Sequence, residues 1–125
     1  MRRSDQRRAA VVALYQVDVT GRPLDDLLDE PATPFTRELA AGAAAQRDRL
    51  DALIEHHAEG WTLDRIAPLE RNILRVALFE LLERPDVPAE VAIDEAVEAA
   101  KELCSVETPA FVNGILGAVV REEVA

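Results

Sequence analysis

Cysteine and long apolar runs are both scarce in this sequence of 125 residues, and each scarcity excludes a class of protein. The single cysteine, Cys104, cannot form an internal disulfide, which is typical of proteins from a reducing compartment. No apolar run approaches the roughly 20 residues that a membrane-spanning helix needs, and none follows the N-terminus in the manner of a signal peptide. We therefore expect a soluble, cytoplasmic protein.

Catalytic and cofactor motifs are also missing. The sequence contains neither a GxxxxGK[ST] phosphate loop nor a GxGxxG dinucleotide fingerprint. His56 and His57 are adjacent, so on a helix their side chains point about 100° apart and cannot easily share one metal ion. Cys104 has no histidine near it in the sequence. We therefore predict that the chain is not an enzyme and binds no metal or other cofactor.

The stretch from Leu69 to Leu82 is the one around which we expect the other elements to be arranged. Its apolar side chains recur at three- and four-residue spacing over two adjacent helix faces: Leu69, Ile73, Leu74, Val76, Ala77, Leu78, Phe79, Leu81 and Leu82. A helix that is apolar over most of its circumference belongs inside a protein, surrounded by other helices. Pro68 favours its start and Arg84-Pro85 its end. Because alanine and leucine are abundant and no alternating pattern is present, we predict an all-α protein.

The remaining helices are predicted from apolar spacing and from their caps. We expect helices or helical turns at Ser4–Val19, Leu24–Leu28, Pro34 to about Ala58, Trp61–Ile66, Pro88–Leu103 and Thr108 to about Val120, which makes about seven with the central one. Thr33 and Thr108 each precede a proline, as an N-cap precedes the first helical residue. Gly42 is a position where a neighbouring helix can approach closely, and Trp61 is expected to pack in the core.

The charge is unevenly distributed along the chain. The net charge is −10, yet Arg2, Arg3, Arg7 and Arg8 fall within the first eight residues, with Asp5 as the only acid among them. Positive charge at a helix N-terminus opposes the helix dipole, so these arginines do not serve helix stability. Two interpretations stay open, a solvated and frayed start of the helix or a surface that binds a polyanion.

Acidic residues recur every four positions along the predicted helix Pro88–Leu103. They are Glu90, Asp94, Glu98 and Glu102. Like charges at this spacing repel each other by a few tenths of a kcal/mol per pair in an isolated helix. The common explanation is a solvated face, and the alternative is a docking face for a basic partner.

Four segments together resemble the NusB family of bacterial transcription antitermination factors. They are RRAAVVALYQ (7–16), LERNILRVALFEL (69–81), DVPAEVAIDEAVEAAKEL (86–103) and FVNGIL (111–116). The resemblance covers nearly the whole chain apart from about residues 19–34. It implies an all-helical fold of two three-helix bundles packed together, about residues 1–60 and 61–125.

The resemblance also implies a function. The family binds single-stranded RNA that contains the boxA element of ribosomal RNA leaders, together with NusE, a small-subunit ribosomal protein. The pair joins NusA and NusG on RNA polymerase and supports processive ribosomal RNA transcription. Some relatives are thought to form homodimers, and a homodimer that covers the basic N-terminus is a further possibility for this chain.

The family's arginine-rich N-terminus implies RNA-binding roles for Arg2, Arg3, Arg7 and Arg8. Arginine neutralises phosphate and can stack on an unpaired base. Four such contacts limit the log–log salt slope to about −3. We expect Arg7→Ala and Arg8→Ala to weaken RNA binding and hardly change the thermal midpoint, because exposed arginines seldom hold a fold together. Tyr15 is expected either to stack on a base or to pack at the edge of the core.

Further site residues follow from the same resemblance. Phe111 is a platform for a base or packs against the linking helix, and Asn113 bonds a base edge or, as we favour, braces a neighbouring helix. The partner surface is assigned to Glu70, Glu90, Asp94 and Glu98. For Glu70 the alternative is a favourable charge near a helix N-terminus.

Two other functions remain open. The same helical fold forms the N-terminal domain of ribosomal RNA cytosine methyltransferases, but 125 residues leave no room for the methyltransferase domain, so we expect an independent family member. The second is a structural adaptor that ignores RNA, which would tolerate loss of the N-terminal arginines.

Overall fold

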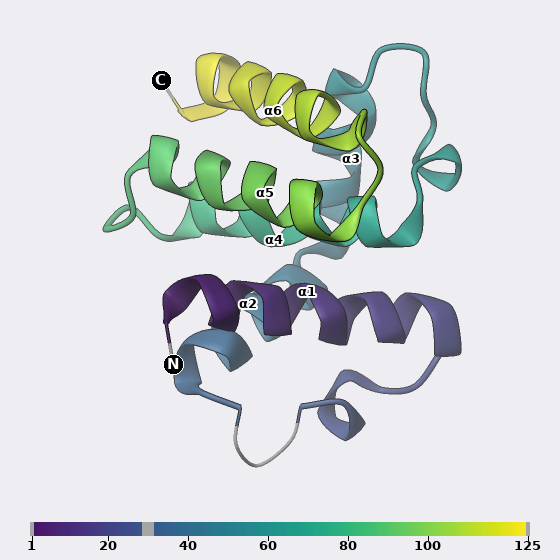
Figure 1. The fold of residues 1–125 in the computed structure, drawn as a ribbon, viewed down its shortest axis with the longest axis vertical. Coiled ribbons are helices and arrows are strands. Elements are labelled where there is room, and N and C mark those ends of the chain that lie inside the picture. The colour runs from purple at the N-terminus through teal and green to yellow at the C-terminus, as the bar shows by residue number, and fades with distance from the viewer. Residues whose placement is uncertain (1, 29–31, 125) are drawn as a thin grey trace.

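The regular structure of this protein is helical throughout the residues that the computed structural model describes, which are 2–28 and 32–124. Six α-helices follow one another: α1 (Arg3–Thr20), α2 (Pro34–Ala45), α3 (Arg47–His57), α4 (Pro68–Glu83), α5 (Ala89–Leu103) and α6 (Thr108–Val119) (Figure 1). Short 3-10 turns occur at Leu24–Asp26 and Leu63–Arg65, and a π-helical turn, Val120–Val124, follows α6. The all-α prediction is confirmed, with a helix count close to the expected seven.

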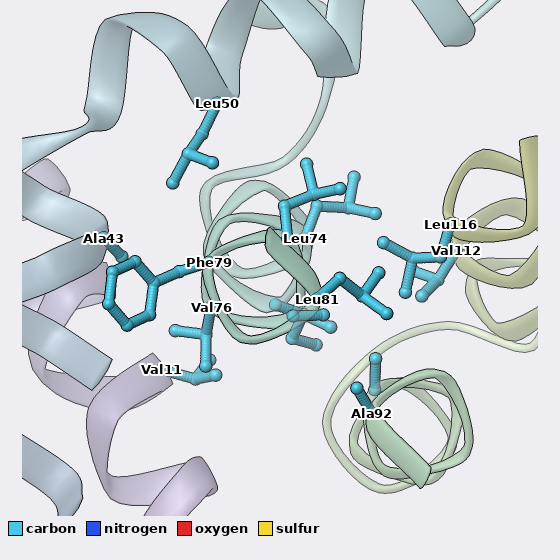
Figure 2. Packing of buried hydrophobic residues seen from close by; sticks show 14 of the residues in the cluster. Val11, Ala43, Leu50, Leu74, Val76, Phe79, Leu81, Ala92, Val112 and Leu116 are labelled. Atoms are coloured by element: carbon cyan, nitrogen blue, oxygen red, sulfur yellow. The ribbon is translucent and has the colours of Figure 1, made fainter. Parts of the chain in front are cut away.

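Helix α4 lies at the centre of the fold, as its apolar circumference predicts. Residues 72–81 are all buried. Figure 2 looks nearly along α4 and shows its side chains pointing toward several neighbours: Val76 toward Val11 of α1, Phe79 toward Ala43 of α2, Leu74 toward Leu50 of α3, and Leu81 toward the side of α6 that carries Val112 and Leu116. The buried residues of all six helices join in one hydrophobic cluster. Since α4 contributes to every part of that cluster, it fixes where the other helices can pack.

The predicted helix from Pro34 to about Ala58 is in fact two helices. The backbone leaves helical geometry at Gln46, where φ is −104° and ψ is 18°. Neither proline nor glycine occupies this position, so local sequence gives little warning of the break. The reason is tertiary, because α2 packs against α1 and α4, whereas α3 packs against α4 and α6.

The two predicted N-caps have different outcomes. Thr33 caps α2 as expected, since its hydroxyl accepts a hydrogen bond from the Thr36 N–H at 3.2 Å. The cap prediction for Thr108 is wrong, because this residue is already inside α6 and Glu107 precedes it. Its buried hydroxyl instead donates a hydrogen bond to Glu70 at 2.6 Å, which joins the first turns of α6 and α4.

A buried polar network connects α1, α3 and α4. Arg75 on α4 is 3% exposed and donates hydrogen bonds to Asp18 of α1 and to Asp51 of α3, each at 2.7 Å. Asn72 donates a further hydrogen bond to Asp18 at 2.9 Å. These contacts satisfy a guanidinium that burial would otherwise leave without partners.

The expected division into bundles of residues 1–60 and 61–125 stays a proposal about the organisation of the chain. The contacts cross that division, because α4 from the second half packs on α1 and α2, and α3 from the first half packs on α4 and α6. Among the described residues, none of the helices has the length and apolar character needed to cross a membrane.

Candidate nucleic-acid interface

The N-terminal turn of α1 presents two exposed arginines. Arg2 precedes the helix, and its side chain, 81% exposed, lies 3.5 Å from the carboxylate of Asp5. Arg3 is also exposed. Its guanidinium lies over the Phe35 ring, 4.2 Å from the ring centre, in a cation–π contact. Both cations therefore reach solvent, where phosphate could meet them.

Arg7 does not share this exposure, which corrects the prediction that all four arginines occupy exposed turns. Its side chain is only 10% exposed. It forms a bidentate ion pair with Glu80 of α4, in which Nε and Nη2 of Arg7 lie 2.9 Å and 2.6 Å from the two carboxylate oxygens. These hydrogen bonds raise the pKa of Arg7 above its usual value. Glu95 of α5 lies 3.9 Å away. The ion pair explains why Arg7 faces inward. Without it, Glu80 would be a buried carboxylate that has no partner, which is energetically costly.

Arg8 is intermediate between these cases. Its side chain is 20% exposed, and its Nε lies 3.1 Å from the carboxylate of Glu102 on α5. A second guanidinium nitrogen donates a hydrogen bond to the carbonyl of Ser4 at 3.2 Å. Ser4 in turn donates to Glu95 at 2.8 Å, so the start of α1 is held along α5. Arg8 can contact RNA only if it exchanges Glu102 for a phosphate.

Two residues of this surface were missed by sequence reasoning. Phe35 of α2 and Arg84, just after α4, complete a group in which Arg3, Arg7 and Arg84 all lie within 5.4 Å of the Phe35 ring centre. Arg84 also contacts Glu38 at 2.7 Å and Asp86 at 2.9 Å, and hydrogen bonds from Arg84 lower the pKa of Asp86 to about 2. About 80 positions separate Arg84 from Arg3 and Arg7, so no local pattern signals that they meet.

The aromatic candidates lie apart from the exposed arginines. Tyr15 is half-buried on α1, two turns beyond Arg8, which is compatible with either of its predicted roles. Phe111 is half-buried on α6, and its ring meets the edge of Trp61 with a centre-to-centre distance of 6.4 Å. Trp61 is 50% exposed, so the prediction that it packs in the core is wrong. Figure 1 places α6 on the far side of α5 from α1.

A cleft of about 210 Å³ opens beside these two aromatic rings. Its walls combine both rings with one cation, two carboxylates, two hydroxyls and one aliphatic side chain: Trp61, Arg65, Ile66, Glu70, Ser105, Glu107, Thr108 and Phe111. Aromatic rings next to an arginine suit an unpaired nucleobase, which can stack on the rings while the cation meets its phosphate.

Asn113 is exposed on α6. Within the part of the chain that the structure describes, no side-chain hydrogen bond joins it to a neighbouring helix, so the favoured bracing role has no support. Its amide therefore remains able to meet a base edge.

The predicted partner residues fall into two groups. Glu70 is half-buried and accepts the hydrogen bond from Thr108, so it holds α6 against α4. Glu90, Asp94 and Glu98 are exposed on α5, and Glu98 lies 3.2 Å from Lys101 on its own helix. Of the four, these three exposed residues are the ones that a basic partner can reach from solvent, with Glu98 already sharing its charge with Lys101.

Comparisons with known proteins agree on one family. The family model described as the NusB family matches residues 4–121. A transcription antitermination protein NusB from Frankia casuarinae is 53% identical over 92 residues, which are 74% of this chain and 68% of that protein. The structure of NusB from T. maritima superposes with a TM-score of 0.90 at 34% identity and covers 100% of this chain and 94% of that one.

A third similarity is to a solved complex of the antitermination factors NusB and NusE with double-stranded RNA. One of its chains aligns with a TM-score of 0.83 at 25% identity, covering 97% of this chain and 98% of that one. The family match spans both ends of the fold and includes α1, α4, α5 and α6. This chain belongs to the NusB family.

Proposed function

We propose that this protein binds boxA-containing single-stranded RNA of ribosomal RNA leaders together with NusE and thereby supports processive ribosomal RNA transcription. The observation that carries this proposal is the pair of exposed arginines, Arg2 and Arg3, on a chain whose net charge is −10. Such a local reversal of charge is the electrostatic footprint of a nucleic-acid site.

Family membership makes the chain a transcription antitermination protein, which is a non-enzymatic factor. The similarity to a complex of NusB and NusE with RNA supports RNA and NusE as partners of this chain. NusA, NusG and RNA polymerase would then be reached through the assembly.

The proposed binding mode divides the work between two regions. Arg2, Arg3 and Arg8 neutralise phosphates along α1, and Tyr15 lies further along the same helix. The cleft formed by Trp61, Arg65 and Phe111 accepts an unpaired base. Asn113 lies two residues after Phe111 on α6. Because Arg7 is committed to Glu80, it is excluded from the contacts with RNA.

NusE would meet the exposed acidic residues of α5. Glu90, Asp94 and Glu98 carry three negative charges, and a small ribosomal protein is expected to be basic because it binds RNA. Complementary charge would mainly speed association and select the partner.

Fluorescence anisotropy tests the proposal with a short boxA-like RNA, a scrambled RNA and a duplex, each with and without NusE. We expect selective binding to the boxA-like strand that NusE strengthens. With three arginines in contact with phosphate, the log–log salt slope without NusE should not exceed about −2. The double variant Arg2→Ala/Arg3→Ala should bind more weakly, whereas Arg22→Ala, an exposed arginine beyond the other end of α1, is the matched control.

Two results would contradict the proposal. Equal affinity for the boxA-like and scrambled RNAs in the presence of NusE would remove sequence selectivity. An unchanged affinity in Arg2→Ala/Arg3→Ala would favour a structural adaptor that ignores RNA. Light scattering at several protein concentrations would show whether a homodimer forms, and its dissociation on addition of RNA is the result expected if the dimer covers the basic N-terminus.

A further inference from the structure

Two histidines and a glutamate converge at the end of α3, at a distance from the proposed RNA-binding residues of α1. His56 and His57 are the last two residues of α3, and Glu122 belongs to the π-helical turn after α6. Their ligand atoms all lie within 4.8 Å of one another. The expectation that adjacent histidines cannot easily share an ion stays a prediction, but in this structure the Nε2 atoms of both rings lie within 3.8 Å of the same carboxylate oxygen of Glu122.

We propose that His56, His57 and Glu122 form a binding site for a divalent transition metal ion, with Zn²⁺ as the expected ion. The Nε2 atoms of His56 and His57 lie 3.8 Å and 3.6 Å from Oε2 of Glu122. Tetrahedral zinc with bonds of 2.0–2.1 Å to nitrogen and oxygen places its ligand atoms about 3.4 Å apart. The two observed edges exceed that value by only a few tenths of an ångström, and the remaining edge, between the two histidine ligand atoms, is at most 4.8 Å.

The environment of His57 gives independent support. Its side chain is only 4% exposed, and its Nε2 has no hydrogen-bond partner among the described residues. The distance of 3.6 Å to Glu122 is too long for a hydrogen bond, so a buried nitrogen lone pair or N–H is left unsatisfied. A metal ion bound at Nε2 would satisfy this atom. His56 and Glu122 are 69% and 57% exposed, which gives the ion a path from solvent.

The ligand set determines which ion fits. Two imidazoles and one carboxylate suit zinc and its first-row neighbours, whereas Mg²⁺ and Ca²⁺ prefer sites made of oxygen ligands alone. Three protein ligands leave the fourth position for water. Because the ligands come from α3 and from residue 122, the bound ion would join the end of α3 to the segment after α6.

Calorimetric titration of the full chain with ZnCl₂ tests this site, using protein without a polyhistidine tag and treated first with a chelator. We expect one Zn²⁺ per chain and no binding of Mg²⁺. Thermal unfolding should show a midpoint raised by roughly 5–10 °C at a hundredfold excess of Zn²⁺ over Kd. Co²⁺ in the same site should give the visible absorption of a tetrahedral nitrogen–oxygen complex.

Three variants separate this site from unspecific binding. Glu122→Gln and His56→Gln each remove one ligand and should weaken Zn²⁺ binding by at least about tenfold. Glu123→Gln changes the charge equally at the exposed neighbouring position and should retain wild-type affinity. Absence of Zn²⁺ binding by the wild type, or equal affinities of Glu122→Gln and Glu123→Gln, would overturn the proposal.

Discussion

At the residue scale, Arg7 and Arg8 are neighbours in sequence with opposite roles in the structure. Arg7→Ala would leave the carboxylate of Glu80, which is 1% exposed, without its partner. We therefore expect the free energy of unfolding to fall by about 3–5 kcal/mol, measured by urea denaturation. Arg8→Ala breaks a more exposed pair and should cost about 1 kcal/mol or less.

The double variant Arg7→Met/Glu80→Met provides the control. Replacing both members of a buried ion pair by apolar side chains is often neutral, so much of the lost stability should return. Equal stability of Arg7→Ala and the wild type would show that the pair contributes nothing.

The contact between Arg8 and Glu102 leads to a prediction about RNA affinity. Glu102→Gln removes the negative charge that competes with phosphate for Arg8, so the affinity for a boxA-like RNA should rise several-fold at low salt. Glu98→Gln changes the net charge equally without touching Arg8, because Glu98 pairs with Lys101. Anisotropy should show a larger gain for Glu102→Gln. The same gain in both variants would mean that only the total charge matters.

At the element scale, the crossing of α2 and α4 depends on a missing side chain. A Cβ atom at Gly42 would overlap the ring of Phe79. Gly42→Ala should therefore lower the free energy of unfolding by about 1–3 kcal/mol, despite the better helix propensity of alanine. Gly114→Ala on α6 meets nothing within 4 Å and should stabilise by up to about 1 kcal/mol. Thermal unfolding compares the two, and a stabilising Gly42→Ala would refute the close packing.

The sequence predicts the ends and the burial of some helices better than those of others. Helix α4 is well predicted because Pro68 and Arg84-Pro85 mark its ends and its apolar residues show that neighbours surround it. The break at Gln46 and the exposure of Trp61 are not predictable in this way. Both depend on which helices α2, α3 and the linking segment meet, and periodicity within one element carries no such information.

At the scale of the whole molecule, the buried polar network of Arg75, Asn72, Asp18 and Asp51 makes the free energy of unfolding depend on pH. Burial alone would raise the pKa of Asp18, but hydrogen bonds from Asn72 and the charge of Arg75 outweigh it and lower the pKa below the ordinary 3.8. A pKa that is lower in the folded state gives stability that is present above about pH 4 and is lost as the pH falls through the folded pKa.

Asp18→Asn tests this dependence. The variant should unfold at a lower temperature than the wild type at pH 7, because Arg75 loses a charged partner. The difference should shrink as the pH falls through the folded pKa of Asp18, because the wild-type carboxyl then becomes protonated as well. Differential scanning calorimetry at several pH values measures both, and a difference that stays constant with pH would refute the role of the carboxylate.

The candidate interface is only partly predictable from the sequence, because some of its features are local and others depend on residues far apart in the chain. The clustering of Arg2 and Arg3 is local, so their exposure at the start of a helix is foreseeable. The partner of Arg7 is 73 positions away, and Arg84 joins the same group from beyond α4. Contacts between distant residues decide which arginines remain free, and a single sequence does not reveal them.

The central place of α4 also has a consequence for the order in which the chain can fold during synthesis. During synthesis α1, α2 and α3 emerge from the ribosome before α4, the helix on which all three pack. The apolar faces that pack on α4 therefore have no partner until residues 68–83 emerge, and Asp18 and Asp51 lack their hydrogen bonds from Arg75 over the same interval. We expect the first 60 residues of a nascent chain to stay open to chaperones and proteases, and the core to close cooperatively once α4 leaves the exit tunnel.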